Sequence, residues 1–304
     1  MAEAATTFND LLREVRGFWT PLPDKPEESA EGLLCALWCT ASGSPVSIDR
    51  AGQASLEPLD ADGLARLRQL IERKRAGVPL AHLTERQTFL GLEFLASAEA
   101  LIPRKETEIL GRAALVKIGC MAKKRGPLLV VDVCTGSGNL ASAYAYYEPQ
   151  ARVCASDLSP EAIELARRNV EFLGLAKRVE LRVGDLLEPF ESPEFAGHCD
   201  FLSCNPPYIS TAKVKQMHPE ISQHEPEAAF NGGAFGVSIL MKLVKNAPRF
   251  LRPGGWLGFE VGHGQGAGLA RQLERNPAFA AVETYSDLGG EIRAILAKSR
   301  PVLP

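Results

Sequence analysis

The sequence lacks the long apolar run that a membrane-spanning helix needs. No stretch of its 304 residues approaches the ~20 consecutive apolar residues that cross a bilayer. The first ten residues also lack a basic segment followed by an apolar one, so no secretory signal is predicted. We therefore expect a cytoplasmic protein without a membrane partner.

The sequence has no excess of positive charge. It contains 34 Lys and Arg against 37 Asp and Glu, which gives a net charge of -3. The isoelectric point is near 6.0. Proteins that depend on a strongly basic face to bind nucleic acid have the opposite balance. Strong binding to nucleic acid is therefore not expected.

A disulfide framework and a metal-binding pattern are also missing. The seven cysteines are odd in number and scattered along the chain. Cys35 and Cys39 could meet on one face of a helix, but no histidine or second cysteine pair completes a zinc set. The five histidines are isolated as well. No metal is predicted.

Two kinds of periodicity divide the chain. Apolar residues at helical spacing predict helices near residues 8–18, 29–41 and 60–75, with a loop at 43–58. Aromatic residues around a glycine at 87–97 fit a short β-hairpin. We predict a small helical domain at residues 1–84, a β-hairpin linker at 85–105 and a larger domain at 106–304.

The larger domain begins with a predicted helix at 108–119, which Thr107 could cap, and the basic run at 123–125 is interpreted as a solvated turn. Strands are then expected at 128–133, 152–157, 179–185 and 199–204, and helices near 139–147 and 160–174. Ser159 is the predicted cap of the second of these helices, with Pro160 at its first position. Short apolar strands that alternate with helices predict an α/β fold with a parallel sheet covered on both faces.

The end of the chain departs from this alternation. A helix near 236–250 precedes a predicted turn at 253–255 and a strand at 256–261. Two further strands, at 282–286 and 292–297, are joined by a short polar turn. This pattern predicts an antiparallel hairpin at the edge of the sheet.

A glycine-rich turn follows the first strand of the predicted sheet. Glycines at its centre allow a ligand to approach the backbone closely, and ligands of open α/β sheets bind at the carboxyl ends of strands. Asp157 ends the second strand, where it could accept hydrogen bonds from ribose hydroxyls. The turn also matches the dinucleotide fingerprint, so an NAD enzyme is a rival at this point. The turn consists of Cys134, Thr135, Gly136, Ser137, Gly138 and Asn139.

Three further residues are candidates for binding the same cofactor. Asp185, at the end of the third strand, could meet an adenine amino group, and Leu186 could lie beside the ring. The alternative for Asp185 is an ordinary loop aspartate. Leu158 follows Asp157 and belongs to the same candidate cofactor site.

The tetrapeptide Asn205, Pro206, Pro207 and Tyr208 follows the fourth strand and decides between the rivals. Two acceptors, the Asn205 side-chain oxygen and the Pro206 carbonyl, would orient a planar NH2 group and favour charge developing on its nitrogen. The prolines stiffen the loop, and Tyr208 offers a flat face. A glycine turn with this tetrapeptide predicts methyl transfer from S-adenosylmethionine to nitrogen, with these four residues as the catalytic set. The second glycine loop, at 225–233, could close over the site or be an ordinary surface loop.

From about residue 79 to 297 the sequence resembles the protein-glutamine N5-methyltransferase family, which modifies peptide-chain release factors and one ribosomal protein. The shared order of segments is more specific than any single motif. The segments are Leu101-Ile102-Pro103-Arg104 before Thr107-Glu108, residues 135–138, Asp157-Leu158-Ser159-Pro160, residues 205–209, Glu225-Pro226, Gly232-Gly233, Pro253-Gly254-Gly255-Trp256 and residues 260–265.

The resemblance implies a seven-stranded Rossmann-like methyltransferase sheet behind a helical domain that helps dock the protein substrate. It implies S-adenosylmethionine as cofactor, contacted by residues 135–138, Asp157 and Asn205. Residues 205–208 would hold the glutamine of a Gly-Gly-Gln loop in a release factor, the implied partner.

Several positions depart from the family pattern. Cys134 stands where the release-factor branch has glycine and resembles the ribosomal-protein branch. Lys105, Asn231 and residues 290–293 also differ, and about the first 75 residues hardly match. The methyl acceptor therefore stays open: a small-molecule or peptide amide, or the N6 of adenine in a nucleic acid, are alternatives. A cofactor-binding interaction module without turnover is the non-enzymatic alternative.

Overall fold

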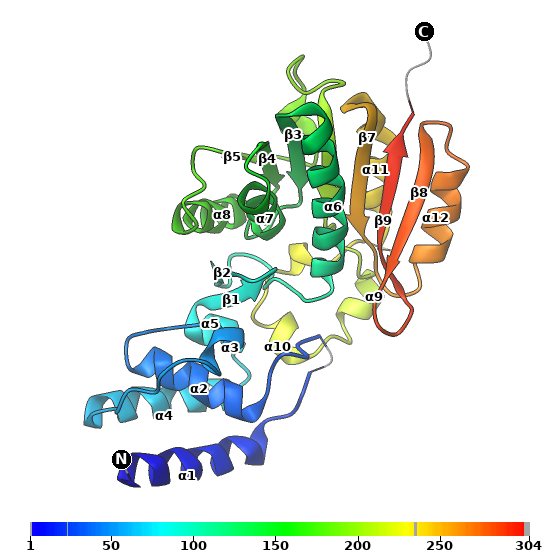
Figure 1. Ribbon diagram of the computed structural model, residues 1–304. Helices are drawn as coiled ribbons and strands as arrows, with labels where there is room; N and C mark the ends of the chain where they lie inside the picture. Colours follow the sequence, from blue (N-terminus) through cyan, green and yellow to red (C-terminus); the bar gives the residue numbers. More distant parts are fainter. Residues whose placement is uncertain (1, 23, 234–235, 301–304) are drawn as a thin grey trace. The chain divides into compact units, whose positions relative to one another are not determined.

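The structure is a computed structural model, and it describes residues 2–22, 24–233 and 236–300 (Figure 1). The chain forms two compact units. The helical unit consists of residues 1–98, 102–105 and 218–225, and the sheet unit consists of residues 99–101, 106–217 and 226–304. The helical unit thus combines the N-terminal region and the hairpin with a segment that is distant in sequence.

The helical unit is built around α2. Leu33, Leu34 and Leu37 of this helix are fully buried in an apolar cluster. The Ser29 hydroxyl caps α2 by accepting from the Gly32 N–H at 3.0 Å, and Asp60 caps α4 in the same way. Its elements are α1 (Ala2–Phe18), α2 (Ala30–Ala41), α3 (Ile48–Ala51), α4 (Ala61–Arg75), α5 (Leu80–Thr84), β1 (Arg86–Phe89), β2 (Leu92–Leu95) and α10 (Pro219–Ser222).

The sheet unit contains a seven-stranded sheet in the order β5-β4-β3-β6-β7-β9-β8. Strands β5 to β7 run parallel, whereas β9 is antiparallel to both β7 and β8. The predicted α/β class and C-terminal antiparallel hairpin are confirmed. Its strands are β3 (Leu128–Val133), β4 (Ala151–Asp157), β5 (Val179–Val183), β6 (Cys199–Cys204), β7 (Leu251–Glu260), β8 (Phe279–Ser286) and β9 (Ile292–Ser299).

Helices pack on both faces of this sheet. On one face, Leu243 of α11 and Leu269 of α12 join a cluster with Val131 and Leu257 of the strands. On the other face, Tyr144 of α7 packs edge-on against Phe201 of β6. The helices of the unit are α6 (Thr107–Arg125), α7 (Asn139–Tyr147), α8 (Pro160–Phe172), η1 (Glu188–Phe190), α9 (Thr211–Val214), η2 (Glu227–Ala229), α11 (Ser238–Asn246), η3 (Ala247–Arg249) and α12 (Gly266–Glu274).

Four local predictions were wrong or incomplete. The short helix α3 lies inside the predicted loop 43–58, and α6 continues through the basic run 123–125. The predicted turn at 253–255 lies within β7, where a shift of register between β6 and β7 accommodates it. Thr107 is the first residue of α6, and Glu106 occupies the cap position. The Thr107 hydroxyl accepts a hydrogen bond from Asn205 instead.

The strand register brings the predicted site residues to one edge of the sheet. Val133 of β3 is level with Ser156 of β4 and with Cys204 of β6. Cys204 in turn is level with Phe259 of β7. The residues that follow these strands therefore emerge together at the carboxyl edge, where open α/β sheets bind their ligands.

Candidate active site

The turn after β3 is held in a left-handed conformation. Gly136 and Gly138 have φ values of 55° and 76°, and Cys134 has 56°. A Cβ added at Gly138 would lie 3.0 Å from the Ala166 Cβ, so glycine allows the turn to approach α8 closely. Asn169, which also belongs to α8, donates from its side-chain amide to the Ser137 carbonyl at 3.0 Å. Contacts with α8 thus fix the position of the turn from Cys134 to Gly138.

Asp157, at the end of β4, is bound to this turn. Its carboxylate accepts from the Gly136 N–H at 2.8 Å and from the Ser159 N–H at 3.0 Å. Burial raises the pKa of Asp157, although these backbone donors oppose the shift. A carboxylate has about four lone-pair positions, so two donors leave capacity for a ligand. The adjacent Leu158 side chain is 69% exposed.

Asp132 is a buried acid that the sequence reasoning missed. It lies within β3, is fully buried and accepts from the Thr135 hydroxyl at 2.6 Å and the Ser203 hydroxyl at 2.5 Å. Burial raises its pKa to about 6 against the effect of both hydroxyls. Asp132 therefore joins β3, the glycine turn and β6. A single carboxylate inside the apolar run 128–133 was the available signal.

Asn205 follows β6 with a defined side-chain orientation. Its amide nitrogen donates to the Thr107 hydroxyl at 3.1 Å, and Thr107 is 1% exposed. Because the amide group is planar, a nitrogen turned toward Thr107 turns the oxygen the opposite way. The side-chain oxygen is thereby left to accept from another group. Thr107 supports the motif, a role that its place at a helix start did not suggest.

Tyr208 is held by a second buried acid. Its hydroxyl donates to Glu260 at 2.8 Å, and Glu260, at the end of β7, is 1% exposed. Burial raises the pKa of Glu260, and burial with the neighbouring Glu260 raises that of Tyr208 well above its ordinary value. The phenol therefore stays protonated and the ring is fixed. Glu260 ends an apolar strand, a signal to which the sequence analysis assigned no role.

The second glycine loop contacts the tetrapeptide. Gly232 donates to the Ile209 carbonyl at 2.8 Å, and Ile209 donates to the Phe230 carbonyl at 2.9 Å. A Cβ added at Gly232 would lie 2.4 Å from the Pro207 carbonyl oxygen, a distance no side chain tolerates. The Gln265 amide also donates to the Tyr208 carbonyl at 3.1 Å. The backbone of the motif is therefore held from two sides.

Asp185 and Leu186 lie in a different setting. Asp185 accepts from Lys242 at 2.6 Å, and both residues line a recess of about 90 Å³ beside α11. Leu186 is 6% exposed with a φ of 50°, and its carbonyl accepts from the Ser156 hydroxyl at 2.8 Å. Leu186 is thus attached to β4, while the Asp185 carboxylate already has a cationic partner.

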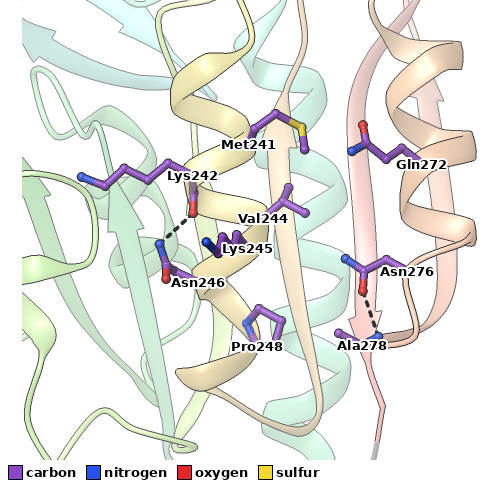
Figure 2. Close-up of a pocket in the computed structure, with 9 residues that line it drawn as sticks. All are labelled: Met241, Lys242, Val244, Lys245, Asn246, Pro248, Gln272, Asn276 and Ala278. Carbon is purple, nitrogen blue, oxygen red and sulfur yellow. Dashed lines mark hydrogen bonds between the residues drawn. The ribbon is translucent and has the colours of Figure 1, made fainter.

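A wider groove of about 890 Å³ lies elsewhere on the sheet unit (Figure 2). It is lined by α11, Pro248 and the residues around Asn276. Pro248 shortly precedes β7, so the groove lies toward the amino end of that strand. Since ligands of such sheets bind at the carboxyl ends, we do not assign the reaction to this groove.

Comparisons with known proteins agree with the fold and define the class. Residues 130–224 match a family model described as a methyltransferase domain. The catalytic domain of human METTL16, solved with an RNA hairpin, superposes with a TM-score of 0.55 at 16% identity over 76% of this chain and 83% of that one. A second structure, the N-terminal domain of human METTL16 with SAH, gives 0.52 at 18% identity, covering 75% and 83%. Residues 130–224 therefore belong to a methyltransferase domain.

Relatives identify the family within this class. A release factor glutamine methyltransferase from Geobacter sulfurreducens is 36% identical over 296 residues, covering 95% of each chain. One from Moorella thermoacetica is 35% identical over 277 residues, covering 91% of this chain and 93% of the relative. The chain belongs to the release factor glutamine methyltransferase family. Within the described ranges, every helix is too short or too polar to span a membrane.

Proposed function

We propose that this enzyme transfers a methyl group from S-adenosylmethionine to the side-chain amide nitrogen, N5, of a glutamine in a peptide chain release factor. The glutamine would belong to a Gly-Gly-Gln loop, and S-adenosylhomocysteine would be the second product. The observation that carries the proposal is the orientation of Asn205. Its amide nitrogen donates to Thr107, and among the described residues its oxygen has no donor. Release factors work in the cytoplasm, so that is the proposed place of action.

The residues at the strand ends fit the proposed cofactor. A Cβ added at Gly136 would meet nothing within 4 Å, so open space lies above this turn. Residues 134–138 would hold the cofactor, with Asp157 beside its ribose and Leu158 near its base. Asp185 and Leu186 stay candidates for the adenine end. When bound, S-adenosylmethionine supplies an electrophilic methyl group on a positively charged sulfur.

The chain's own part in the reaction is to orient a poor nucleophile. The lone pair of an amide nitrogen is delocalised, so its N–H groups must be held in place. The Asn205 side-chain oxygen and the Pro206 carbonyl would accept these two N–H groups and favour the charge that develops on nitrogen. The rigid Pro206-Pro207 turn and the fixed Tyr208 ring would limit the other orientations. The methylated nitrogen is acidic enough to lose its proton to water, so no side-chain base is required.

The helical unit would dock the protein substrate. Residues 1–84 contain its apolar core, whereas the proposed chemistry is confined to the sheet unit. A separate docking surface suits a substrate that is itself a folded protein, since remote contacts can contribute binding energy to orientation.

The proposal is tested by incubating the protein with a release factor and methyl-labelled cofactor and mapping the label by mass spectrometry. We expect one methyl group on the glutamine of the Gly-Gly-Gln loop. A release factor with alanine at that position is the control and should stay unlabelled. Good transfer to another acceptor, with no label on that glutamine, would overturn the substrate assignment.

A further inference from the structure

The loop that follows the tetrapeptide belongs partly to the other unit. The chain leaves the sheet unit after Met217, contributes residues 218–225 to the helical unit and returns at Pro226. Tyr208 and Gly232 lie on either side of this excursion. Whatever holds residues 218–225 therefore restrains both arms of the loop that contacts the motif.

Within residues 211–229, all of which the structure describes, only two side chains are buried, and both are acids: Glu220 and Glu225. Ile221, the apolar residue of α10, is only partly buried. A surface loop is ordinarily anchored by apolar side chains, because charged groups lose hydration when buried. Residues 211–229 are instead anchored by two carboxylates, and the next residue, Phe230, is the apolar side chain buried at the end of the loop.

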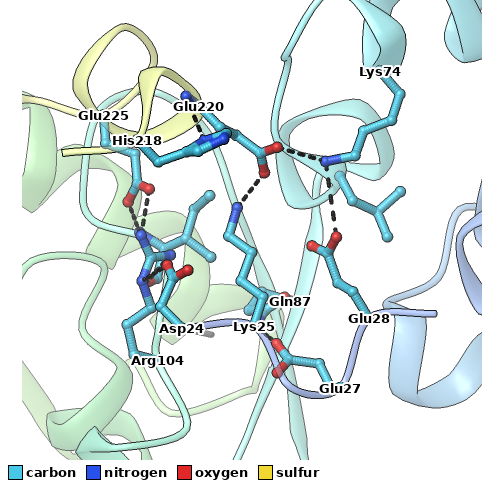
Figure 3. A network of polar contacts seen from close by, with 12 residues as sticks. Asp24, Lys25, Glu27, Glu28, Lys74, Gln87, Arg104, His218, Glu220 and Glu225 are labelled. Carbon is cyan, nitrogen blue, oxygen red and sulfur yellow. Dashed lines mark hydrogen bonds and ion pairs between the residues drawn. The ribbon is translucent and has the colours of Figure 1, made fainter. Parts of the chain in front are cut away.

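Glu220 binds two lysines from distant parts of the helical unit (Figure 3). Lys74 of α4 donates to it at 2.9 Å, and Lys25 donates to its other oxygen. Glu28 lies 3.8 Å from the same Lys74. All of these side chains are less than one-tenth exposed. Removing one partner from such a cluster leaves an uncompensated buried charge.

Glu225 uses both carboxylate oxygens. One accepts from the Arg104 guanidinium at 2.5 Å and the other from the Ile102 N–H at 2.9 Å, and the side chain is fully buried. Charge-assisted bonds with two fixed donors define position more strictly than a single contact does. Arg104 also lies 3.5 Å from Asp24, so the guanidinium is itself oriented.

We propose that Glu220 and Glu225 are positioning residues that tether the loop at 209–233, and through it the Asn205–Tyr208 motif, to the helical unit. The tether acts through Ile209, which follows Tyr208 in the chain and exchanges backbone hydrogen bonds with Phe230 and Gly232. Gly232 also packs closely against the Pro207 carbonyl. Restraint of this loop would help hold the motif in the orientation that the proposed reaction requires. This inference rests on the proposed function, but the tether itself can be tested without it.

The experiment compares Glu220→Gln and Glu225→Gln with the matched control Glu72→Gln in the full chain. Glu72 forms an exposed pair with Arg75 in the same helix as Lys74. Trypsin cleavage at Lys213 and Lys215, both exposed and ahead of the tether, reports the freedom of the loop. Cleavage at the exposed Lys177 reports general loosening. Cofactor affinity is measured by calorimetry, and KM and kcat are measured with intact release factor.

We expect faster cleavage at Lys213 and Lys215 with an unchanged rate at Lys177. The kcat/KM for release factor should fall about tenfold to a hundredfold, since small misplacements of a reacting group have effects of this size. Cofactor affinity should stay unchanged, because the glycine turn is not part of the tether. Glu72→Gln should behave as wild type in every measurement.

A double variant is added in case one of the single variants folds poorly. Lys25→Met with Glu220→Gln removes both members of one ion pair and leaves Lys74 beside Glu28. Because the two residues are coupled, the double variant should lose about as much as Glu220→Gln alone. Unchanged cleavage and unchanged kcat/KM in all variants, even with a lower melting temperature, would overturn the proposal and leave only a stabilising role. If the wild-type protein does not methylate release factor, the proposed function is wrong. The cleavage rates then still show whether Glu220 and Glu225 restrain the loop.

Discussion

The acids that hold the loop in the helical unit and the acids near the strand ends of the sheet unit are buried against different partners. In the helical unit, Glu220 and Glu225 meet lysine and arginine. In the sheet unit, Asp132 and Glu260 accept from hydroxyl groups. Burial raises the pKa of Glu220, but Lys25 and Lys74 outweigh it and the net shift is downward. The pKa values of Asp132 and Glu260 are raised by burial.

The two kinds of partner suit different tasks, since the helical unit holds a loop and the sheet unit is proposed to hold a ligand. Paired charges in the helical unit fix the path of a loop, which needs position only. The carboxylates Asp132, Asp157 and Glu260 near the strand ends have no lysine or arginine among their hydrogen-bond donors in the described residues. Of the three, Asp157 has two backbone donors that leave lone pairs open, so its carboxylate stays available to a ligand.

Two acids limit the comparison. Glu28 lies near Lys74, yet burial raises its pKa. Asp200, buried in β6 of the sheet unit, accepts from Arg252 at 2.8 Å.

The largest expected effect comes from removing the oriented amide. Asn205→Ala should lower turnover about a hundredfold or more, because it deletes an acceptor aimed at the reacting nitrogen. Cofactor affinity should change little. Gln150→Ala is the control, since that exposed amide precedes β4, at the opposite end of the strand from the candidate site. Near-normal turnover of Asn205→Ala under saturating cofactor would refute the role of the motif.

A smaller effect is expected at the cofactor side of the sheet. Asp157→Ala should weaken cofactor binding about tenfold or more, since hydrogen bonds to a carboxylate are lost. The kcat at saturating cofactor should be affected much less than that of Asn205→Ala. Calorimetry and initial rates separate the two quantities. Unchanged affinity would remove Asp157 from the cofactor site.

The smallest expected effect is a change of the free energy of unfolding with pH, and it differs between the two units. Burial raises the pKa of the Asp132 carboxyl from its ordinary value of 3.8 in the unfolded chain to about 6 in the folded protein. Between these values the folded state keeps a proton that the unfolded state has released, so the sheet unit loses stability as pH rises, by on the order of 1–3 kcal/mol. Burial lowers the pKa of His82 from 6.5 to about 4, so the helical unit should lose stability as pH falls through that range.

Tryptophans can report the two units separately. Trp19 and Trp38 belong to the helical unit, and Trp256 belongs to the sheet unit. Urea unfolding of Trp256→Phe, and of the double variant Trp19→Phe with Trp38→Phe, should give opposite slopes of stability against pH. Asp132→Asn should flatten the slope of the sheet unit and His82→Gln that of the helical unit. Parallel slopes would show that the two buried environments do not differ as described.

The sheet could be predicted from the sequence because its signals are local. Residues 128–133 and 199–204 form strands at the predicted positions, since continuous apolar runs bounded by turns have few other solutions. The Ser159 cap and the Pro160 start of α8 were predicted for the same reason and are confirmed. The family followed from the order of motifs and is borne out by the relatives.

What the sequence could not predict depends on tertiary contacts. Lys25 and Glu220 are 195 residues apart, and no periodicity connects them. Thr107 read as a helix cap, because its actual partner, Asn205, lies 98 residues further on. Asp132 and Glu260 sit in strands, where a carboxylate is unexpected until the hydroxyls that satisfy it are known.

The discontinuous make-up of the helical unit has a consequence for how the protein is made. Synthesis proceeds from the N-terminus, and domains generally fold as they emerge from the ribosome. The ribosome synthesises the cations of these ion pairs (Lys25, Lys74 and Arg104) long before their partners Glu220 and Glu225. Until then the helical unit lacks two of its buried carboxylates. The region that starts the chain therefore completes its charge balance only after the proposed catalytic tetrapeptide has been synthesised.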